Sequence, residues 1–280
     1  MNKSTIKASI VILDFLKSKR VCENVESLQK QHTNFDFEII IVDNSCNLQN
    51  AEKLNTLKKF PNVQVHINPK NVGYIKANNQ GADLAKGEFL LIVNPDMILA
   101  ETDTLQKLID YMEAHKDVGV LGPKQINDSV NQLAMSVRAF PNIFLQVARR
   151  TFWRKLPVIK NWVAYDEMQH LDYDKTQTVD WLQSSFWVTR KKLWEQLGGL
   201  NNAYFLFMSD PDFCFKCWEA GYKVVYYPEA KVYADGIRVS AGGFTAFFQK
   251  WTLRQHLKDA LIYQFKHLGK GNPHHKVMKR

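Results

Sequence analysis

The chain has few cysteines, no long apolar run and none of the common signature loops of nucleotide or protease chemistry. Its 280 residues include four cysteines, too few for a disulfide scaffold, so we expect reduced thiols, with Cys214 and Cys217 buried. No stretch approaches the ~18 apolar residues that a membrane-spanning helix needs, and the first residues do not resemble a secretory signal. We therefore expect a cytoplasmic protein.

Several catalytic motifs are missing as well. The sequence contains no GxxxxGK[ST] phosphate loop, no GxGxxG after a strand, no GxSxG and no HExxH. These absences argue against a kinase, a dinucleotide oxidoreductase, a serine hydrolase of the usual type and a zinc protease. A nucleotidyltransferase is also disfavoured, because the region of the first expected strand lacks a glycine-rich basic loop.

The charge balance is basic, with a formal net charge of +9. Such a charge favours nucleic acid, an anionic membrane surface or phosphorylated substrates as partners. No helix-turn-helix, zinc-finger or aromatic RNA-binding signature accompanies it, so we expect no nucleic-acid partner.

Buried-strand patterns alternate with helical patterns along the first half of the chain. Short apolar runs lie at 8–13, 37–42, 63–67 and 89–93, and apolar residues at helical spacing lie between and after them. This alternation predicts an α/β domain whose mostly parallel sheet is covered by helices on both faces.

The pattern changes after Pro123. We expect an insertion or lid over 127–178, one aromatic-rich strand over 179–189, an apolar run over 204–208, and a helix containing Phe213 and Cys217. A last strand is predicted over 223–227, ended by Pro228.

The tail beyond Gly242 carries aromatic and basic residues at helical spacing. Phe244, Phe247, Phe248 and Trp251 share one helical face, with Lys250, Arg254 and Lys258 nearby. Such a helix either lies on an anionic membrane surface or packs on the domain with a solvated basic side, and the sequence leaves both open.

Acidic residues follow the expected strands. Asp43, Asp96 and the pair Asp210 and Asp212 come where strands end, and Pro95 turns the chain out of the sheet just before Asp96. Open α/β sheets bind ligands at this edge. Carboxylates there can hold a divalent metal on a diphosphate, and a separate carboxylate can deprotonate a hydroxyl. Asp210 and Asp212 can also cap a helix; we expect one to cap and Asp210 to act as the base.

At these residues the chain resembles the family 2 glycosyltransferases, and within them the bacterial rhamnosyltransferase-like members. The resemblance covers about residues 9–236. It rests on an ordered set of motifs: Asp43-Asn44-Ser45, Asn71-Val72-Gly73, Gly87-Glu88-Phe89, Asn94-Pro95-Asp96, Val179-Asp180-Trp181-Leu182, Leu197-Gly198-Gly199, Asp210-Pro211-Asp212 and Ala220-Gly221-Tyr222-Lys223.

The resemblance implies a GT-A fold, which has a Rossmann-like, mostly parallel sheet. It implies a nucleotide-sugar-binding half at 1–123 and an acceptor-binding half at 124–240, followed here by a basic helical tail at 241–280. The implied reaction is an inverting, Mg²⁺- or Mn²⁺-dependent transfer of a sugar, with rhamnose a candidate, from a dTDP- or UDP-linked donor. The implied acceptor is a cell-surface polysaccharide or a polyprenyl-diphosphate-linked saccharide, reached at the inner face of the plasma membrane.

The resemblance also implies roles for individual residues. Asp210 is the expected base, and Asp96, joined by Asp235, is the expected metal ligand. Trp181 and Asp212 are expected on the acceptor side. The expected donor-binding residues are Leu13, Asp14, Asp43, Gly73, Lys76, Asn79 and Asn94.

Some positions depart from the family pattern. Ser209 replaces a common glutamate, Pro211 replaces an aliphatic residue, and Ser184 or Ser185 replaces a common glycine. Ala234 stands where a histidine often helps to bind metal or diphosphate. Either Asp235 takes over that role, or metal binds more weakly, or activity is reduced. The alternative function is therefore a glycosyltransferase-like binding or scaffold protein with weak or lost turnover.

Overall fold

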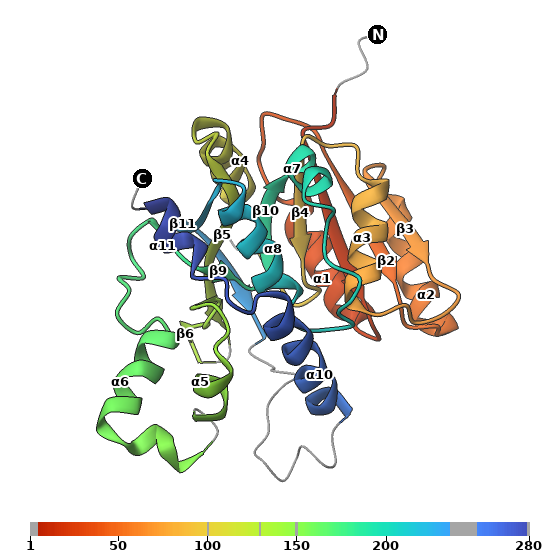
Figure 1. Cartoon of the computed structure of the whole chain (residues 1–280). Helices are drawn as coiled ribbons and strands as arrows, with labels where there is room; N and C mark the ends of the chain where they lie inside the picture. Colours follow the sequence, from red (N-terminus) through yellow and green to blue (C-terminus); the bar gives the residue numbers. More distant parts are fainter. Residues whose placement is uncertain (1–4, 100, 129, 149–150, 236–250, 279–280) are drawn as a thin grey trace.

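The centre of the molecule is one large mixed sheet. A computed structural model describes residues 5–99, 101–128, 130–148, 151–235 and 251–278. Within them, a nine-stranded sheet has the order β3-β2-β1-β4-β10-β5-β11-β8, with β6 paired to β5. Helices lie on both faces (Figure 1). The predicted α/β class is confirmed.

The first half of the chain follows the predicted alternation, and its first four strands are parallel to one another. Its elements are β1 (Ala8–Asp14), α1 (Ser18–Gln29), β2 (Phe37–Asp43), α2 (Leu48–Asn55), η1 (Thr56–Lys59), β3 (Val63–Ile67), α3 (Tyr74–Leu84), β4 (Phe89–Val93) and α4 (Thr104–Ala114).

The second half adds strands of both directions. Its elements are β5 (Val118–Asn127), β6 (Gln132–Leu133), β7 (Val137–Arg138), α5 (Ile143–Ala148), η2 (Phe152–Lys155), α6 (Pro157–Asp166), β8 (Gln177–Thr178), β9 (Trp181–Leu182), β10 (Phe186–Arg190), α7 (Lys191–Gln196), α8 (Ser209–Glu219), β11 (Lys223–Ala234), α10 (Trp251–Lys266) and α11 (Pro273–Met278). β10 is antiparallel to both β4 and β5, whereas β11 is parallel to β5.

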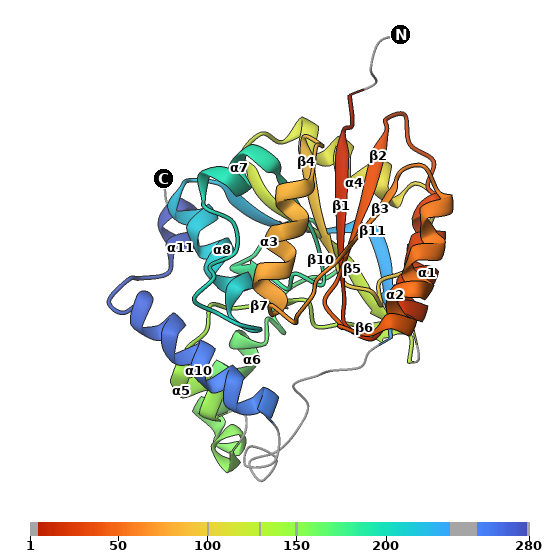
Figure 2. The same ribbon diagram turned by 90° about the vertical axis from the view of Figure 1, so that its right-hand side faces the viewer.

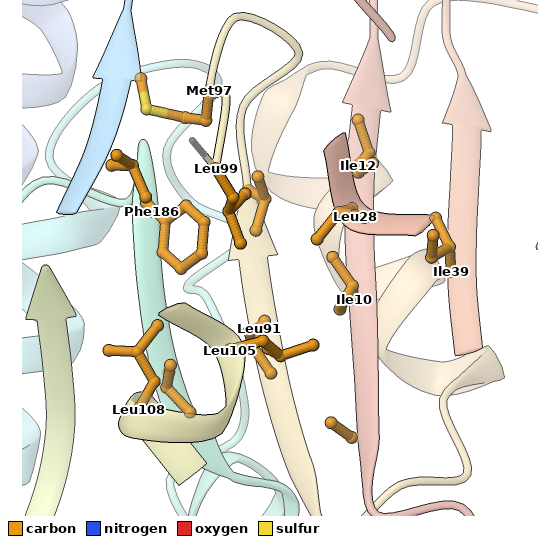
Figure 3. Packing of buried hydrophobic residues seen from close by; sticks show 14 of the residues in the cluster. Ile10, Ile12, Leu28, Ile39, Leu91, Met97, Leu99, Leu105, Leu108 and Phe186 are labelled. Atoms are coloured by element: carbon orange, nitrogen blue, oxygen red, sulfur yellow. The ribbon is translucent and has the colours of Figure 1, made fainter. Parts of the chain in front are cut away.

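Apolar side chains are buried on both faces of the sheet, which explains why β1 reads as a continuous apolar run. Ile10 and Ile12 of β1 contribute to the core beneath α1 and α4, whereas Val11 and Leu13 contribute to the core beneath α3 and α8. Figure 3 shows the first of these cores, with Leu91 of β4 close to Ile10.

Two predictions about strands were wrong in their bounds. The expected single strand over 179–189 is two strands: β9 pairs with β7 in a separate two-stranded sheet, and β10 joins the main sheet. The strand expected to end at Pro228 continues to Ala234. Proline is tolerated there because the pairing with β5 is interrupted between Tyr227 and Lys231, where no ladder bond is lost.

β5 was not predicted. Glycines and a proline weaken its sequence signal, yet Gly119 leaves room for close packing, because a Cβ there would lie 2.8 Å from the Cβ of Tyr222. The expected apolar run over 204–208 forms a loop rather than regular structure.

The segment expected to be an insertion contains α5, η2 and α6, which project beyond one edge of the sheet (Figures 1 and 2). In the tail, α10 packs on the domain and buries Leu253, Ala260 and Tyr263, as the packing alternative expects. Phe244, Phe247 and Phe248 lie outside the described residues. No helix in the described part of the chain is long and apolar enough to cross a membrane.

Candidate active site

The carboxyl ends of the parallel strands gather polar side chains at one edge of the sheet. Asp14 at the end of β1 is paired in register with Asp43 at the end of β2. β4 ends at Val93, so Asn94 and Asp96 leave the sheet at the same edge. This is the edge at which open α/β sheets bind ligands.

Asp43 has one oxygen engaged and one without a partner. Its Oδ1 accepts hydrogen bonds from the N–H of Ser45 at 2.9 Å, the Ser45 hydroxyl at 2.5 Å and the Asn50 amide at 3.3 Å. Its Oδ2 is buried and has no hydrogen-bond partner among the described residues. A buried acceptor without a donor is costly, and an N–H or O–H of a bound ligand would satisfy it.

The neighbouring Asp14 is held from the other side. Its Oδ2 accepts from the Asn50 amide at 2.5 Å and its Oδ1 from the N–H of Lys17 at 2.9 Å. Burial raises the pKa of the Asp14 carboxyl, and the Asn50 hydrogen bond opposes that shift only in part. Asn50 therefore couples the two strand-end carboxylates.

Amide side chains fix the loop that follows β3. Asn44 donates to Asn71 Oδ1 at 2.7 Å and accepts from the N–H of Val72 at 3.0 Å. The loop then reaches Gly73, whose φ of 88° favours glycine. A Cβ there would lie 2.9 Å from the Phe205 ring and 3.1 Å from the Phe205 carbonyl oxygen. The loop is thus wedged between the end of β2 and residue 205.

A pair of carboxylates forms beside the end of β4. An antiparallel bridge joins Ile98 to Tyr233, which places Asp96 opposite Asp235. Lys17 Nζ lies 4.0 Å from an oxygen of each carboxylate. Burial raises the pKa of Asp96, Lys17 opposes the shift, and the neighbouring Asp235 adds to it. A cavity of about 240 Å³ opens here, lined also by Arg20 and Asp128.

This pair fits a divalent cation held jointly with a substrate. Carboxylate oxygens are the ligands that Mg²⁺ and Mn²⁺ prefer, and Mg²⁺ commonly uses one or two of them together with substrate phosphates and water. Among the described residues no group of three or more acidic, histidine or cysteine side chains could hold a metal. Phosphate oxygens and water would therefore complete the coordination around Asp96 and Asp235.

Asp210 lies in the first turn of α8. Its Oδ2 accepts from the N–H of Ser184 at 3.1 Å, and its Oδ1 accepts from the hydroxyls of Ser184 at 2.8 Å and Ser209 at 3.0 Å. Burial raises the pKa of Asp210, and these hydrogen bonds limit the rise. A carboxylate with a raised pKa is suited to accept a proton near neutral pH.

Tyr74 connects the two parts of this edge. Its hydroxyl lies 3.3 Å from Asn94 Oδ1 and 3.0 Å from Ser184 Oγ. Burial, followed by the charge of Asp210, raises the pKa of the Tyr74 hydroxyl, so it remains a hydrogen-bond donor. Because the Ser184 hydroxyl donates to Asp210, the single proton of Tyr74 can go either to Ser184 Oγ or to Asn94 Oδ1, so Tyr74 bonds one of the two at a time.

The remaining expected site residues lie outside this group. Lys76 is exposed on α3. The Asn79 side chain donates to the Leu200 carbonyl at 2.8 Å and accepts from the Leu200 N–H at 3.0 Å. Trp181 donates from its indole to the Ala139 carbonyl at 2.7 Å. These contacts show how each is held, and their binding roles stay predictions.

Asp212 is fully buried beneath α10, away from solvent. His267 Nε2 lies 2.8 Å and Lys266 Nζ 2.9 Å from its oxygens. Burial would raise the pKa of Asp212, but the contacts with His267 and Lys266 outweigh it and lower the pKa. In this structure Asp212 anchors the tail helix, whereas Asp210 faces Ser184 and Tyr74.

Sequence reasoning missed Lys17 and Tyr74 as members of the site. Lys17 follows β1 by three residues without any motif, and its place between Asp96 and Asp235 depends on the end of β11. Tyr74 follows the conspicuous Asn71-Val72-Gly73, so its position at the start of α3 was a usable signal.

The sheet order, the crossover strand β10 and the carboxylates at one edge define a GT-A fold. The sequence profile of Glycosyl transferase family 2 matches residues 9–197. The chain belongs to this family.

Curated relatives agree with that assignment. The chain is similar to an N-acetylglucosaminyl-diphospho-decaprenol L-rhamnosyltransferase of Mycobacterium tuberculosis, at 26% identity over 63% of this chain and 60% of the relative. It is also similar to the rhamnosyltransferase WbbL of Escherichia coli, at 27% identity over 71% of this chain and 68% of that protein. The alignment thus spans less than two thirds of the mycobacterial relative's length.

Two solved structures share the fold at low identity. A mannosyltransferase of Pyrobaculum calidifontis, solved with GDP-Man and Mn²⁺, matches with a TM-score of 0.57 and 13% identity over 99% of this chain and 79% of that one. GalNAc-T7, solved with UDP, GalNAc and Mn²⁺, matches with a TM-score of 0.64 and 14% identity over 94% of this chain and 50% of that one.

Proposed function

We propose that the chain is an inverting, metal-dependent glycosyltransferase that moves a sugar from a nucleotide-sugar donor to a hydroxyl of a saccharide acceptor. The observation that carries the proposal is the division of the carboxylates into two sets with different partners. Asp96 and Asp235 share Lys17, whereas Asp210 is bonded to Ser184. An inverting displacement needs such a division, because the leaving diphosphate and the attacking hydroxyl lie on opposite faces of the sugar.

The roles of the residues follow from that division. Asp43, with its unpartnered oxygen, would accept a hydrogen bond from the nucleoside, and the loop ending at Gly73 would line it together with Leu13, Asp14, Lys76 and Asn79. Asp96 and Asp235 would hold Mg²⁺ or Mn²⁺, which would neutralise charge on the departing diphosphate.

The oxygen of the acceptor hydroxyl would bond to the anomeric carbon of the donor sugar, and Asp210 would take the proton from that hydroxyl. The bond from that carbon to the diphosphate breaks, and the electron pair leaves with the diphosphate. Asn94 and Tyr74 would keep Ser184, and through it Asp210, in position for this transfer.

The donor and acceptor classes come from the relatives. The names of the mycobacterial and Escherichia coli proteins favour rhamnose as the sugar, and the mycobacterial name favours a polyprenyl-diphosphate-linked saccharide as acceptor. We propose dTDP or UDP as the nucleotide of the donor. We propose that transfer takes place at the inner face of the plasma membrane, during synthesis of a cell-surface polysaccharide.

A donor screen tests this proposal. The protein is heated with each of a panel of nucleotide sugars, with Mn²⁺ or with a chelator, and its melting temperature is recorded. A bound donor at about 100 times its dissociation constant adds roughly 2.7 kcal/mol of stability. We expect stabilisation by a dTDP- or UDP-sugar only with metal, followed by transfer with inverted anomeric configuration. A stabilising donor that is never hydrolysed or transferred would favour a binding protein instead.

A further inference from the structure

The helices α5 and α6, with the turn η2 between them, expose an unusual amount of apolar surface. Large side chains of this segment are 38–72% exposed: Phe144, Val147, Phe152, Trp153, Leu156, Val158, Trp162 and Tyr165. We call this set the α5–α6 surface. Exposed apolar patches of this kind commonly mark a site of interaction with a protein or a membrane.

The aromatic members lie against one another. The ring of Phe144 is 5.9 Å from that of Trp153 and 6.4 Å from that of Trp162, and Phe152 is 6.2 Å from Trp153. They therefore form one cluster, which a single partner can cover at once.

Basic residues dominate the charge of the same segment, whose one acidic residue is Asp166 at the end of α6. Residues 141–165 contain no aspartate or glutamate and five basic residues: Arg149, Arg150, Arg154, Lys155 and Lys160. Arg154 lies 3.2 Å from Glu167, which belongs to the turn after α6, and Lys155 and Lys160 are exposed. Tryptophan and tyrosine side chains favour the interface between lipid headgroups and tails, and basic side chains favour anionic headgroups. The chemistry of the surface thus matches an anionic bilayer.

The surface also lies at the functional end of the molecule. Figures 1 and 2 show α5 and α6 projecting beyond the edge at which β1 and β4 end. At its root, β7 pairs with β9, which ends two residues before Ser184. On the adjacent side, Gln264 of α10 donates to the Pro141 carbonyl at 2.8 Å, and α10 exposes Trp251, Leu257, Leu261 and Phe265.

We propose that the α5–α6 surface, together with the outer side of α10, docks on an anionic phospholipid bilayer. Docking in this orientation turns the sheet edge that bears Asp210 toward the membrane. A saccharide carried on a membrane-embedded lipid then meets the base directly. This last consequence rests on the proposed function, whereas the docking itself does not.

The first test measures binding of the full chain to vesicles of phosphatidylcholine with phosphatidylglycerol, and to phosphatidylcholine alone, by co-sedimentation. We expect binding to the anionic vesicles that weakens as salt is added. The double variant Phe152→Ser, Trp162→Ser should bind at least about tenfold more weakly, because burial of even one such side chain changes an equilibrium by more than that. Leu48→Ser is the matched control, since Leu48 is 82% exposed on α2, away from this surface.

A second variant removes charge without touching the aromatic cluster. Lys155→Gln, Lys160→Gln should weaken binding to the anionic vesicles by about fivefold per lysine at low salt and leave phosphatidylcholine unaffected. Melting temperatures of all variants are compared with that of the unaltered chain, so that a folding defect is not mistaken for a loss of vesicle binding.

Three results would overturn the proposal. The unaltered chain does not bind anionic vesicles at low salt; Leu48→Ser weakens binding as much as the surface variants do; or the chain self-associates through this surface, so that Phe152→Ser, Trp162→Ser is monomeric in ultracentrifugation while vesicle binding is unchanged. Stabilisation by nucleotide sugar is measured in parallel on the same samples. Vesicle binding without any donor stabilisation would leave docking intact and count against the proposed function alone.

Discussion

Ser184 holds Asp210 with two groups at once: its N–H lies 3.1 Å from Oδ2 and its hydroxyl 2.8 Å from Oδ1. The hydroxyl also lies 3.0 Å from that of Tyr74, so this serine joins the proposed base to the residues at the end of β4. The Ser184 side chain therefore helps to hold the carboxylate of the proposed base.

Removing that hydroxyl should shift the pH dependence of turnover. Hydrogen bonds to the carboxylate lower the pKa of Asp210 against the effect of burial, so their loss raises it further. The base must be deprotonated to act, and activity is lost as pH falls through its pKa. Ser184→Gly should therefore move the acid limb of the kcat/KM profile to higher pH. Ser185→Ala, which removes only a contact with Gln125, is the control and should leave that limb in place.

Neutralising the carboxylate pair should weaken metal binding. Asp96→Asn and Asp235→Asn each remove one of the two proposed anionic ligands. Substituting a residue that only hydrogen-bonds to a metal ligand commonly lowers metal affinity about 10–100-fold, so we expect each of these variants to lose at least about tenfold in Mn²⁺ affinity. Calorimetric titration of Mn²⁺ in the presence of UDP measures the effect. Asp103→Asn, at a half-exposed carboxylate on α4's N-terminal side, serves as the control. Unchanged Mn²⁺ affinity in both variants would remove these residues from the metal site.

The loop at Gly73 should not tolerate a side chain. Gly73→Ala combines an unfavourable φ of 88° with a contact of 2.9 Å to the Phe205 ring, and we expect a loss of roughly 1–3 kcal/mol in stability together with weaker donor binding. Gly198→Ala isolates the backbone cost, because Gly198 has a φ of 74° but nothing within 4 Å of its would-be Cβ. Equal thermal shifts in the two variants would show that contact with Phe205 has no effect.

The tail helix should stabilise the loop next to the site. Asp259 of α10 is fully buried and accepts from the backbone N–H groups of Phe205, Leu206 and Phe207 at 3.3, 3.1 and 2.9 Å. Asp259→Asn should lower the free energy of unfolding by about 1–3 kcal/mol, because charged hydrogen bonds are lost from a buried position. Denaturant unfolding compares it with Lys258→Gln, at an exposed neighbour on the same helix. If both variants unfold at the same denaturant concentration, the tail does not support the loop.

The parallel half of the fold was readable because each of its strands is buried on both faces. Phe89–Val93 and Ile10–Leu13 are continuous apolar runs for this reason, and the residues that follow them mark the ligand edge. The strand β5 was hidden, because its glycines are chosen by contacts with Leu182 and Tyr222 rather than by strand propensity.

The residues of the site and its surroundings likewise fall into those that the sequence indicated and those that it did not. Asp43, Asp96 and Asp210 could be found because each follows a recognisable strand or motif. Lys17 and Asp259 could not, because their roles depend on segments far away in sequence: Lys17 on the end of β11, and Asp259 on the loop at 205–207. Asp212 is the opposite case, a conspicuous motif residue whose partners, Lys266 and His267, belong to a tail beyond the family resemblance.

The central claim is that Asp210 is the base of a glycosyl transfer. Its most direct test is Asp210→Asn, measured for turnover and for donor binding in the same preparation with Mn²⁺. We predict turnover lower by a factor on the order of 100 or more, because general base catalysis contributes about that much. Stabilisation by the nucleotide sugar should be retained, since the proposed donor and metal sites consist of other residues, among them Asp43, Asp96 and Asp235. Turnover close to that of the unaltered chain would contradict the assignment, and with it the division of carboxylates on which the proposed function rests.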